Sequence, residues 1–299
     1  MKTLGLVGKN VEPFPRFPDE PKWESLSDEE KRYQSKLMAI YAAMVDDVDV
    51  YIGKIIDHLK AIGEYDNTFI FFMADNGPEA HNLDEAWEGL TEFVQGCCDN
   101  SVENIGKANS YVWYGQNWGQ ASNTPLRMYK GFPTQGGVRV PAFAHFPKSI
   151  RKNVRDDQVL TVMDVMPTLL DLTGIGHPGT PYRNRDVVEM MGRSMLPVLQ
   201  GRTEQVHADD YVIGWELFSK RAIRKGDWKI IYEPFHAVLE PRVAGIKTDT
   251  WQLYNLAEDP AEINDLSEKN PEKLAEMIKH WDEYVNDTGL VIPDSWDGY

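Results

Sequence analysis

The sequence contains only two cysteines among its 299 residues, and the two are adjacent, Cys97 and Cys98. Neighbouring cysteines cannot build the disulfide framework of a small secreted domain, and they match no zinc-ligand spacing. We therefore expect a pair of free thiols, a state that fits a reducing compartment.

The sequence also lacks long apolar runs. No stretch approaches the roughly 20 apolar residues that a transmembrane helix needs. The apolar part of residues 1–9 is too short for a signal peptide. Any export signal would lie upstream of Met1, so cytoplasmic and periplasmic locations both stay open.

Positive charge is scarce: 31 Lys and Arg stand against 47 Asp and Glu, which gives a formal net charge of −16. Such a surface repels nucleic acid and anionic membranes, so we expect neither as a partner. It also repels anionic substrates, so any anion site needs a local positive centre. The length is sufficient for one large domain or two.

The first half of the sequence has the alternation of helix and buried strand that is typical of an α/β fold. Ser27 and Glu30 form a capping box at the start of a helix with an apolar stripe on one face. The stripe consists of Leu37, Tyr41, Met44, Val48, Ile52, Ile55 and Leu59. The apolar run 68–74 then predicts a strand buried on both faces of a parallel sheet. In such sheets ligands bind beyond the carboxyl ends of strands, where Asp75 and Asn76 lie.

The composition changes near residue 174, after an expected strand at 138–146 and an expected helix at 163–172. Four short strands are then expected at 211–217, 222–223, 228–232 and 251–254, and Asn270-Pro271 begins a final helix. Strands followed by a helix favour a smaller α+β subdomain. We therefore predict two domains, residues 1–174 and 175–299.

A few side chains are suited to holding a cation and an anion. Asp75 and Asn76 offer a carboxylate and an amide oxygen, which calcium and magnesium prefer, although Asp-Asn-Gly is also typical of a simple turn. Lys130 is either a point charge that neutralises an anionic substrate oxygen or a solvated surface lysine. Arg127 can serve the same purpose or pair with a nearby carboxylate. His81 is either a proton donor to a leaving group or a polar surface residue.

In their order and spacing, a set of short motifs resembles the C-terminal portion of a type I sulfatase, and among these the bacterial arylsulfatases of the Pseudomonas type. The similarity covers essentially the whole sequence. The motifs are Tyr41-Ala42-Ala43-Met44-Val45, Asp66-Asn67-Thr68-Phe69-Ile70, Asp75-Asn76-Gly77, Ser110-Tyr111-Val112-Trp113-Tyr114-Gly115, Tyr129-Lys130, Gly136-Gly137-Val138-Arg139-Val140-Pro141, Asp164-Val165-Met166-Pro167-Thr168-Leu169-Leu170-Asp171-Leu172, and Trp251-Gln252-Leu253-Tyr254-Asn255-Leu256 with Asp259-Pro260.

The resemblance implies a partial alkaline-phosphatase-like sheet with flanking helices, plus a small C-terminal subdomain with an antiparallel sheet and a helix. It implies hydrolysis of sulfate esters by a formylglycine, made from Cys or Ser in a C/S-x-P-x-R motif, with one calcium ion. By match to the family motifs, Asp75 and Asn76 would be calcium ligands and Lys130 the catalytic lysine that contacts the sulfate. No family role attaches to His81.

The sequence departs from the family in its first part. Neither Cys97 nor Cys98 begins a C/S-x-P-x-R motif, and the first pair of metal aspartates has no equivalent. We therefore expect the C-terminal part of an arylsulfatase with half of a calcium site, inactive alone. Its partners would be a small sulfate ester and the absent N-terminal portion.

Two alternatives stay open. One is a phosphonate or phosphate ester hydrolase of the same superfamily, although the Asn76 amide, in place of a histidine ligand, favours a sulfatase. The other is a non-catalytic remnant or one subunit of a split enzyme. Without the leading strands, apolar surface would be exposed, so we expect the bare chain to aggregate or to bind a partner.

Overall fold

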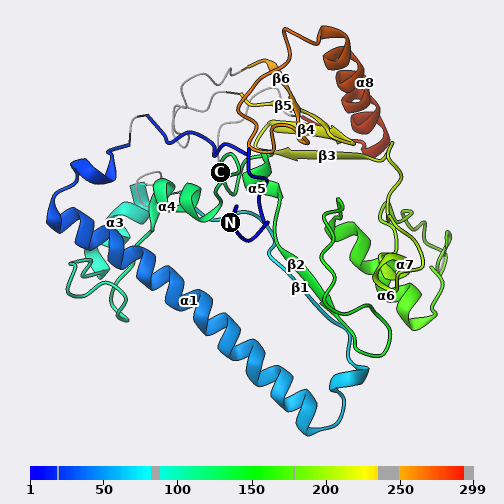
Figure 1. The fold of residues 1–299 in the computed structure, drawn as a ribbon, viewed down its shortest axis with the longest axis horizontal. Helices are drawn as coiled ribbons and strands as arrows, with labels where there is room; N and C mark the ends of the chain where they lie inside the picture. Colours follow the sequence, from blue (N-terminus) through cyan, green and yellow to red (C-terminus); the bar gives the residue numbers. More distant parts are fainter. Residues whose placement is uncertain (19, 82–87, 178, 235–248, 293–299) are drawn as a thin grey trace. The chain divides into compact units, whose positions relative to one another are not determined.

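The computed structural model describes residues 1–18, 20–81, 88–177, 179–234 and 249–292 (Figure 1). The chain divides into two compact units. The first contains Met1–Tyr51, Ala74–Pro141 and Val212–Tyr299, and the second contains Ile52–Met73 and Ala142–Tyr211. The boundary near residue 174 stays a prediction. No helix in the described ranges has the length and apolar character needed to cross a membrane.

The predicted long helix is confirmed as α1 (Asp28–Ala61). Its capping box is formed: the backbone N–H of Ser27 donates to Glu30 Oε2 over 2.7 Å, and the backbone N–H of Glu30 donates to Ser27 Oγ over 3.2 Å. Leu37 is the one buried residue of this helix. Met44 and Ile55, from the predicted apolar stripe, are each 62% exposed. The described residues therefore leave much of the stripe uncovered.

The second unit contains the predicted strand as β1 (Ile70–Met73), but its surroundings differ from the prediction. It pairs antiparallel with β2 (Ala142–His145) in a two-stranded sheet. All four β1 residues are only partly buried. The prediction of a parallel strand buried on both faces was wrong for the described structure, because a two-stranded sheet has no flanking strands and its two faces are not both covered.

The expected helix at 163–172 is confirmed as α6 (Val165–Thr173). It ends at Gly174, whose φ of 69° is the left-handed conformation typical of a residue that follows a helix. The expected strand at 138–146 is shorter than predicted, because α5 (Gln135–Val138) occupies its start. Helix α5 belongs to the first unit, and the short helices of the second unit are η2 (Tyr65–Asn67), η3 (Val162–Asp164) and α7 (Leu196–Leu199).

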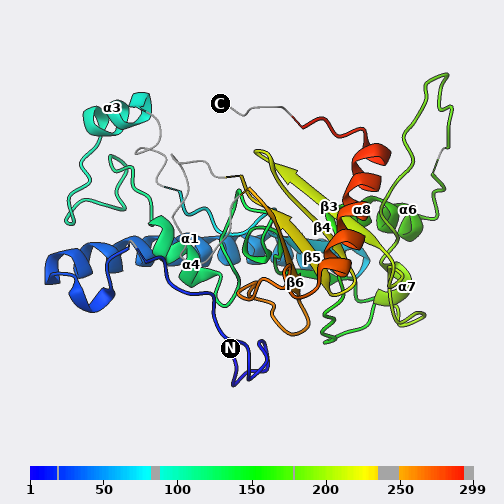
Figure 2. The same cartoon turned by 90° about the horizontal axis from the view of Figure 1, so that it is seen from above.

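The first unit contains the predicted antiparallel sheet and final helix (Figure 2). The strands, in sheet order, are β3 (Val212–Leu217), β4 (Lys220–Lys225), β5 (Trp228–Tyr232) and β6 (Trp251–Asn255). Helix α8 (Pro271–Thr288) packs on this sheet through Met277 and Trp281, which cluster with Ile223, Ile230 and Leu253. The predicted strand and helix patterns therefore produce the expected α+β core.

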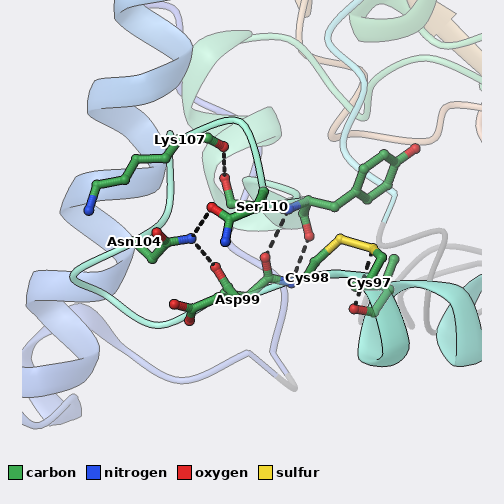
Figure 3. Close-up of a disulfide and its surroundings, with 10 residues drawn as sticks. Cys97, Cys98, Asp99, Asn104, Lys107 and Ser110 are labelled. Atoms are coloured by element: carbon green, nitrogen blue, oxygen red, sulfur yellow. Dashed lines mark hydrogen bonds between the residues drawn. A yellow bond between two sulfur atoms is a disulfide. The ribbon is translucent and has the colours of Figure 1, made fainter.

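The remaining elements of the first unit are η1 (Trp23–Ser25), α3 (Glu88–Cys97) and α4 (Gly115–Ser122). Cys97 and Cys98 are joined by a disulfide, so the prediction of two free thiols was wrong (Figure 3). Helix α3 ends at Cys97, and the backbone between the two cysteines is therefore not held in helical geometry. With the thiols oxidised, the argument for a reducing compartment loses its basis.

Candidate functional site

The segment after β1 lies beside the segment that carries Lys130. The backbone N–H of Lys130 donates to the carbonyl of Pro78 over 3.0 Å, and the N–H of Gly77 donates to the carbonyl of Gly137 over 2.9 Å. Gly77 has no room for a side chain, because a Cβ there would lie 1.9 Å from the carbonyl oxygen of Gly136. The fold thus places the Asp75-Asn76 pair and Lys130 on adjoining backbone segments.

Asp75 and Asn76 follow β1 after a single intervening residue, at the carboxyl end of the strand, as predicted. The Asp75 side chain is exposed and Asn76 is partly buried. Within the described part of the chain, no recorded hydrogen bond or ion pair occupies either side chain. Their oxygens are of the type that calcium binds, but calcium takes about six to eight ligands. The described residues contain no group of three or more His, Cys, Asp or Glu side chains arranged to hold a metal. The pair thus fits calcium in ligand type and supplies only part of a ligand set.

Lys130 forms an ion pair with a residue that the sequence did not single out. Its Nζ lies 3.0 Å from Glu79 Oε2. The other oxygen of the same carboxylate lies 2.6 Å from His81 Nδ1 and accepts the backbone N–H of His81 over 3.0 Å. The Lys130 side chain is 49% exposed, so its ammonium remains open to a ligand. Glu79 therefore connects the predicted anion-binding lysine to the histidine that sequence reasoning left unassigned.

The environment of Glu79 keeps it ionised. Partial burial by itself raises the pKa of the carboxyl, but hydrogen bonds from the His81 side chain and backbone and from Lys130 outweigh it and lower the pKa to about 2. The only feature of the sequence that could have pointed to Glu79 is its position, three residues after Asn76 in the same loop. This position does not indicate that Glu79 pairs with Lys130, because Lys130 is remote in sequence.

The His81 ring is packed between aromatic side chains and backbone. It meets Tyr129 edge to face, with ring centroids 5.2 Å apart, and lies parallel to Phe132 at 6.4 Å. Gly131 has a φ of 87°, and a Cβ there would come within 3.3 Å of His81 Cε1. Tyr129 is fully buried and Phe132 nearly so. This packing restricts movement of the imidazole. Because the imidazole is hydrogen-bonded to Glu79, it also restricts movement of the Glu79 carboxylate.

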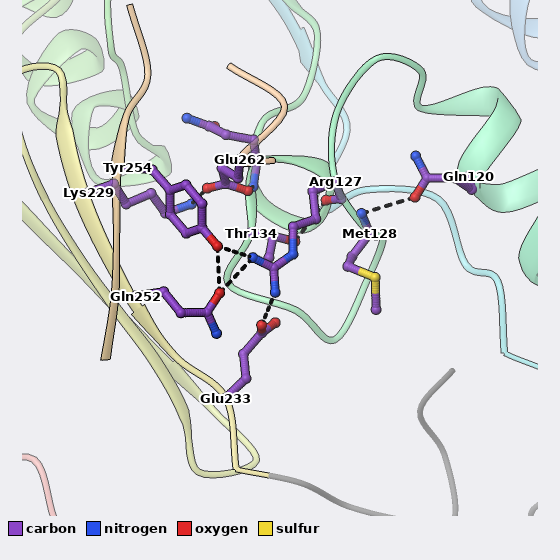
Figure 4. Close-up of polar contacts among 10 residues, drawn as sticks. Gln120, Arg127, Met128, Thr134, Lys229, Glu233, Gln252, Tyr254 and Glu262 are labelled. Atoms are coloured by element: carbon purple, nitrogen blue, oxygen red, sulfur yellow. Dashed lines mark hydrogen bonds and ion pairs between the residues drawn. The ribbon is translucent and has the colours of Figure 1, made fainter. Parts of the chain in front are cut away.

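Arg127 takes the second of its two predicted roles, which is pairing with a carboxylate. It is fully buried and forms an ion pair with Glu233 (Figure 4). It also donates to Gln252 Oε1 over 3.1 Å and to Tyr254 Oη over 3.0 Å. Burial opposes the positive charge, but Glu233 and Tyr254 together raise the pKa of Arg127. Arg127 thus ties the segment that carries Lys130 to the sheet.

A second buried ion pair holds the far end of the same segment. Lys229 of β5 lies 2.8 Å from Glu262, and both side chains are fully buried. The other oxygen of Glu262 accepts the backbone N–H of Gln135 over 2.8 Å. The Lys220 ammonium of β4 lies 4.6 Å from the centre of the Phe132 ring, a cation–π contact. The sheet therefore contacts residues on both sides of Lys130 through buried polar groups.

Comparison with known proteins finds sulfatases along the chain. A family model described as Sulfatase matches residues 8–175, and one described as N-sulphoglucosamine sulphohydrolase, C-terminal, matches residues 128–288. An uncharacterised sulfatase from Schizosaccharomyces pombe is 43% identical over 99% of this chain and 52% of its own length. An arylsulfatase from Klebsiella aerogenes is 33% identical over 66% of this chain and 42% of its own length.

Among solved structures, Ps i-CgsB in complex with k-i-k-neocarrahexaose matches with a TM-score of 0.55 and 24% identity, over 90% of this chain and 48% of that one. This likeness confirms the predicted fold class, an alkaline-phosphatase-like α/β part with a small antiparallel sheet and helix. The chain spans about half the length of the curated relatives it matches. The family match over more than half of the residues, together with the 43% identity along nearly the whole chain, shows that the chain belongs to the sulfatase family.

Proposed function

We propose that this chain is the C-terminal part of an enzyme that hydrolyses sulfate monoesters, and aryl sulfates in particular. The observation that carries the proposal is the adjoining position of the Asp75-Asn76 pair and Lys130, in a chain of the sulfatase family. The 33% identity to an arylsulfatase from Klebsiella aerogenes supports an aryl ester as the substrate class and an arylsulfatase of bacterial type.

Each of the three residues has a defined role in this proposal. The Lys130 ammonium is the catalytic and substrate-binding group, which neutralises a sulfate oxygen as negative charge develops there. Asp75 and Asn76 would supply two of the ligands of a calcium ion, which would contribute Lewis-acid and orienting chemistry when bound. Glu79 orients the Lys130 ammonium through their ion pair, and His81 holds Glu79. The buried ion pairs of Arg127 and Lys229 hold the backbone on which Lys130 lies.

The nucleophile is the part that these residues do not supply. The 299 residues contain no C/S-x-P-x-R motif from which a formylglycine could be made. We therefore propose that the nucleophile and the other metal ligands belong to an N-terminal portion outside this sequence, joined to it or supplied as a partner.

The experiment is a turnover assay of the purified chain with 4-nitrophenyl sulfate in the presence of calcium. We expect no release of 4-nitrophenol above the background rate, because no group in the chain can take the place of the covalent nucleophile. Addition of a sulfatase N-terminal portion that carries the formylglycine should produce turnover, and Lys130→Ala in this chain should remove it. Clear turnover by the chain alone would contradict the proposal.

The same assay with 4-nitrophenyl phosphate tests the alternative of a phosphate ester hydrolase. In the complemented enzyme, we expect the sulfate ester to be the better substrate. A preference for the phosphate ester would support the alternative.

A further inference from the structure

Glu79 stands out because it places a negative charge beside the one cation assigned to bind substrate. Its carboxylate lies 3.0 Å from the Lys130 ammonium, and both side chains are reached by solvent, Glu79 being 34% and Lys130 49% exposed. An anion that approaches Lys130 from solvent therefore also approaches Glu79. Attraction by the lysine is partly offset by repulsion from the carboxylate.

The carboxylate cannot readily turn away when an anion arrives. It accepts hydrogen bonds from the side chain and the backbone of His81, and the His81 ring is itself packed against Tyr129 and Phe132. An ordinary surface ion pair has no such restraint, and its partners separate at little cost. Here the negative charge is fixed in place.

The effect of a fixed negative charge depends on the charge of the ligand. A sulfate monoester carries one negative charge, whereas a phosphate monoester of the same shape carries close to two at neutral pH. Repulsion from Glu79 is therefore about twice as large for the phosphate ester, and so is attraction by Lys130, while the two ligands fill the same space. Glu79 thus reduces the advantage that the lysine alone would give to the doubly charged ester.

We propose that Glu79 is a specificity-determining residue, which makes the Lys130 site discriminate against doubly charged phosphate monoesters in favour of singly charged sulfate monoesters. The inference rests on the proposed function, since it takes Lys130 as the sulfate-binding group. His81 is a positioning residue in it, because it acts by holding Glu79.

The test compares the binding of 4-nitrophenyl sulfate and 4-nitrophenyl phosphate to the full chain at pH 8, by NMR titration of Kd. The quantity compared is the ratio of the two Kd values, in the unsubstituted chain and in Glu79→Gln. Glu79→Gln should strengthen binding of the phosphate ester more than that of the sulfate ester. For charges about 5 Å apart, screened nearly as in bulk water because both side chains are reached by solvent, the ratio of the two Kd values should shift by roughly three- to tenfold.

Matched variants separate charge from structure. Glu79→Asp keeps the charge and should keep the discrimination, even where both affinities change. Glu276→Gln removes a carboxylate from a similarly exposed ion pair with Lys273 on α8 and should leave the ratio unchanged. An unchanged ratio in Glu79→Gln, with binding of both esters intact, would overturn the inference alone. Failure of the unsubstituted chain to bind the sulfate ester, or binding that survives Lys130→Met, would overturn the proposed function and this inference with it.

Discussion

At the scale of single residues, a few charged side chains lie where the fold removes water. Arg127, Lys229 and Glu262 are fully buried, each with a partner of opposite charge. A buried pair contributes little net stability when intact, but removal of one partner leaves an uncompensated charge. Such residues are therefore sensitive to substitution although they contact no substrate.

The clearest case is Arg127. We expect Arg127→Met to lower the free energy of unfolding by about 3–5 kcal/mol, because the Glu233 carboxylate would stay buried after losing the guanidinium charge beside it. The double variant Arg127→Met with Glu233→Gln should recover part of this loss, since it removes both charges. Urea denaturation of the four proteins of the cycle measures the effect. Losses that simply add would contradict a direct coupling of the two residues.

At the scale of elements, the site depends on how closely two loops approach. Gly77 and Gly136 are nearly in contact, and no side chain fits between the loops at Gly77. The close approach brings the Asp75-Asn76 pair beside the Lys130 segment. A substitution that separates the two loops should therefore change the position of the Asp75-Asn76 pair relative to the Lys130 segment more than it changes the rest of the fold.

We expect Gly77→Ala to destabilise the chain by about 1–3 kcal/mol, because the added methyl group would collide with backbone that is hydrogen-bonded on the other side. Gly53→Ala is the matched control, since the same substitution on α1 meets no atom within 4 Å. Thermal unfolding of both variants tests this. Equal melting temperatures for Gly77→Ala and the unsubstituted chain would show that the loops can separate freely.

The same elements show where sequence reasoning succeeds. Helix α1 and the strands of the C-terminal sheet follow from local apolar periodicity and a capping box, which act over a few residues. Asp75, Asn76 and Lys130 could be singled out by motif resemblance, and their roles remain proposals. Glu79 and the partner of Arg127 could not be found, because contacts between residues remote in sequence leave no periodic signal. The disulfide and the antiparallel pairing of β1 likewise depend on where neighbouring elements end.

At the scale of the whole molecule, the uncovered apolar side chains govern behaviour in solution. Met44, Val48, Tyr51 and Ile55 recur along α1 at spacings of three and four and are between 50% and 62% exposed. A soluble protein rarely leaves so continuous an apolar stripe open to water. The sequence prediction that the bare chain associates with itself or with a partner therefore gains support from this helix.

We expect the purified chain to self-associate at micromolar concentrations, and light scattering after size exclusion measures its mass. Val48→Glu with Ile55→Lys should reduce association, because both charges lie on the exposed stripe and leave the net charge unchanged. The control is Asp47→Lys with Lys54→Asp on α1, which also keeps the net charge but leaves the apolar stripe unchanged. It should not reduce association. A monodisperse monomer at every concentration would contradict the expectation.

The two buried ion pairs also bear on how the chain tolerates being cut. Through Arg127 itself, and through the hydrogen bond of the Gln135 backbone to Glu262, they link residues 127–135 to the sheet that begins more than seventy residues later, at Val212. A backbone break anywhere in residues 142–211 would leave these contacts intact within the first unit. The sheet and the lysine segment are therefore linked by direct side-chain contacts as well as by the intervening peptide chain, and the length of that stretch can vary without changing these contacts.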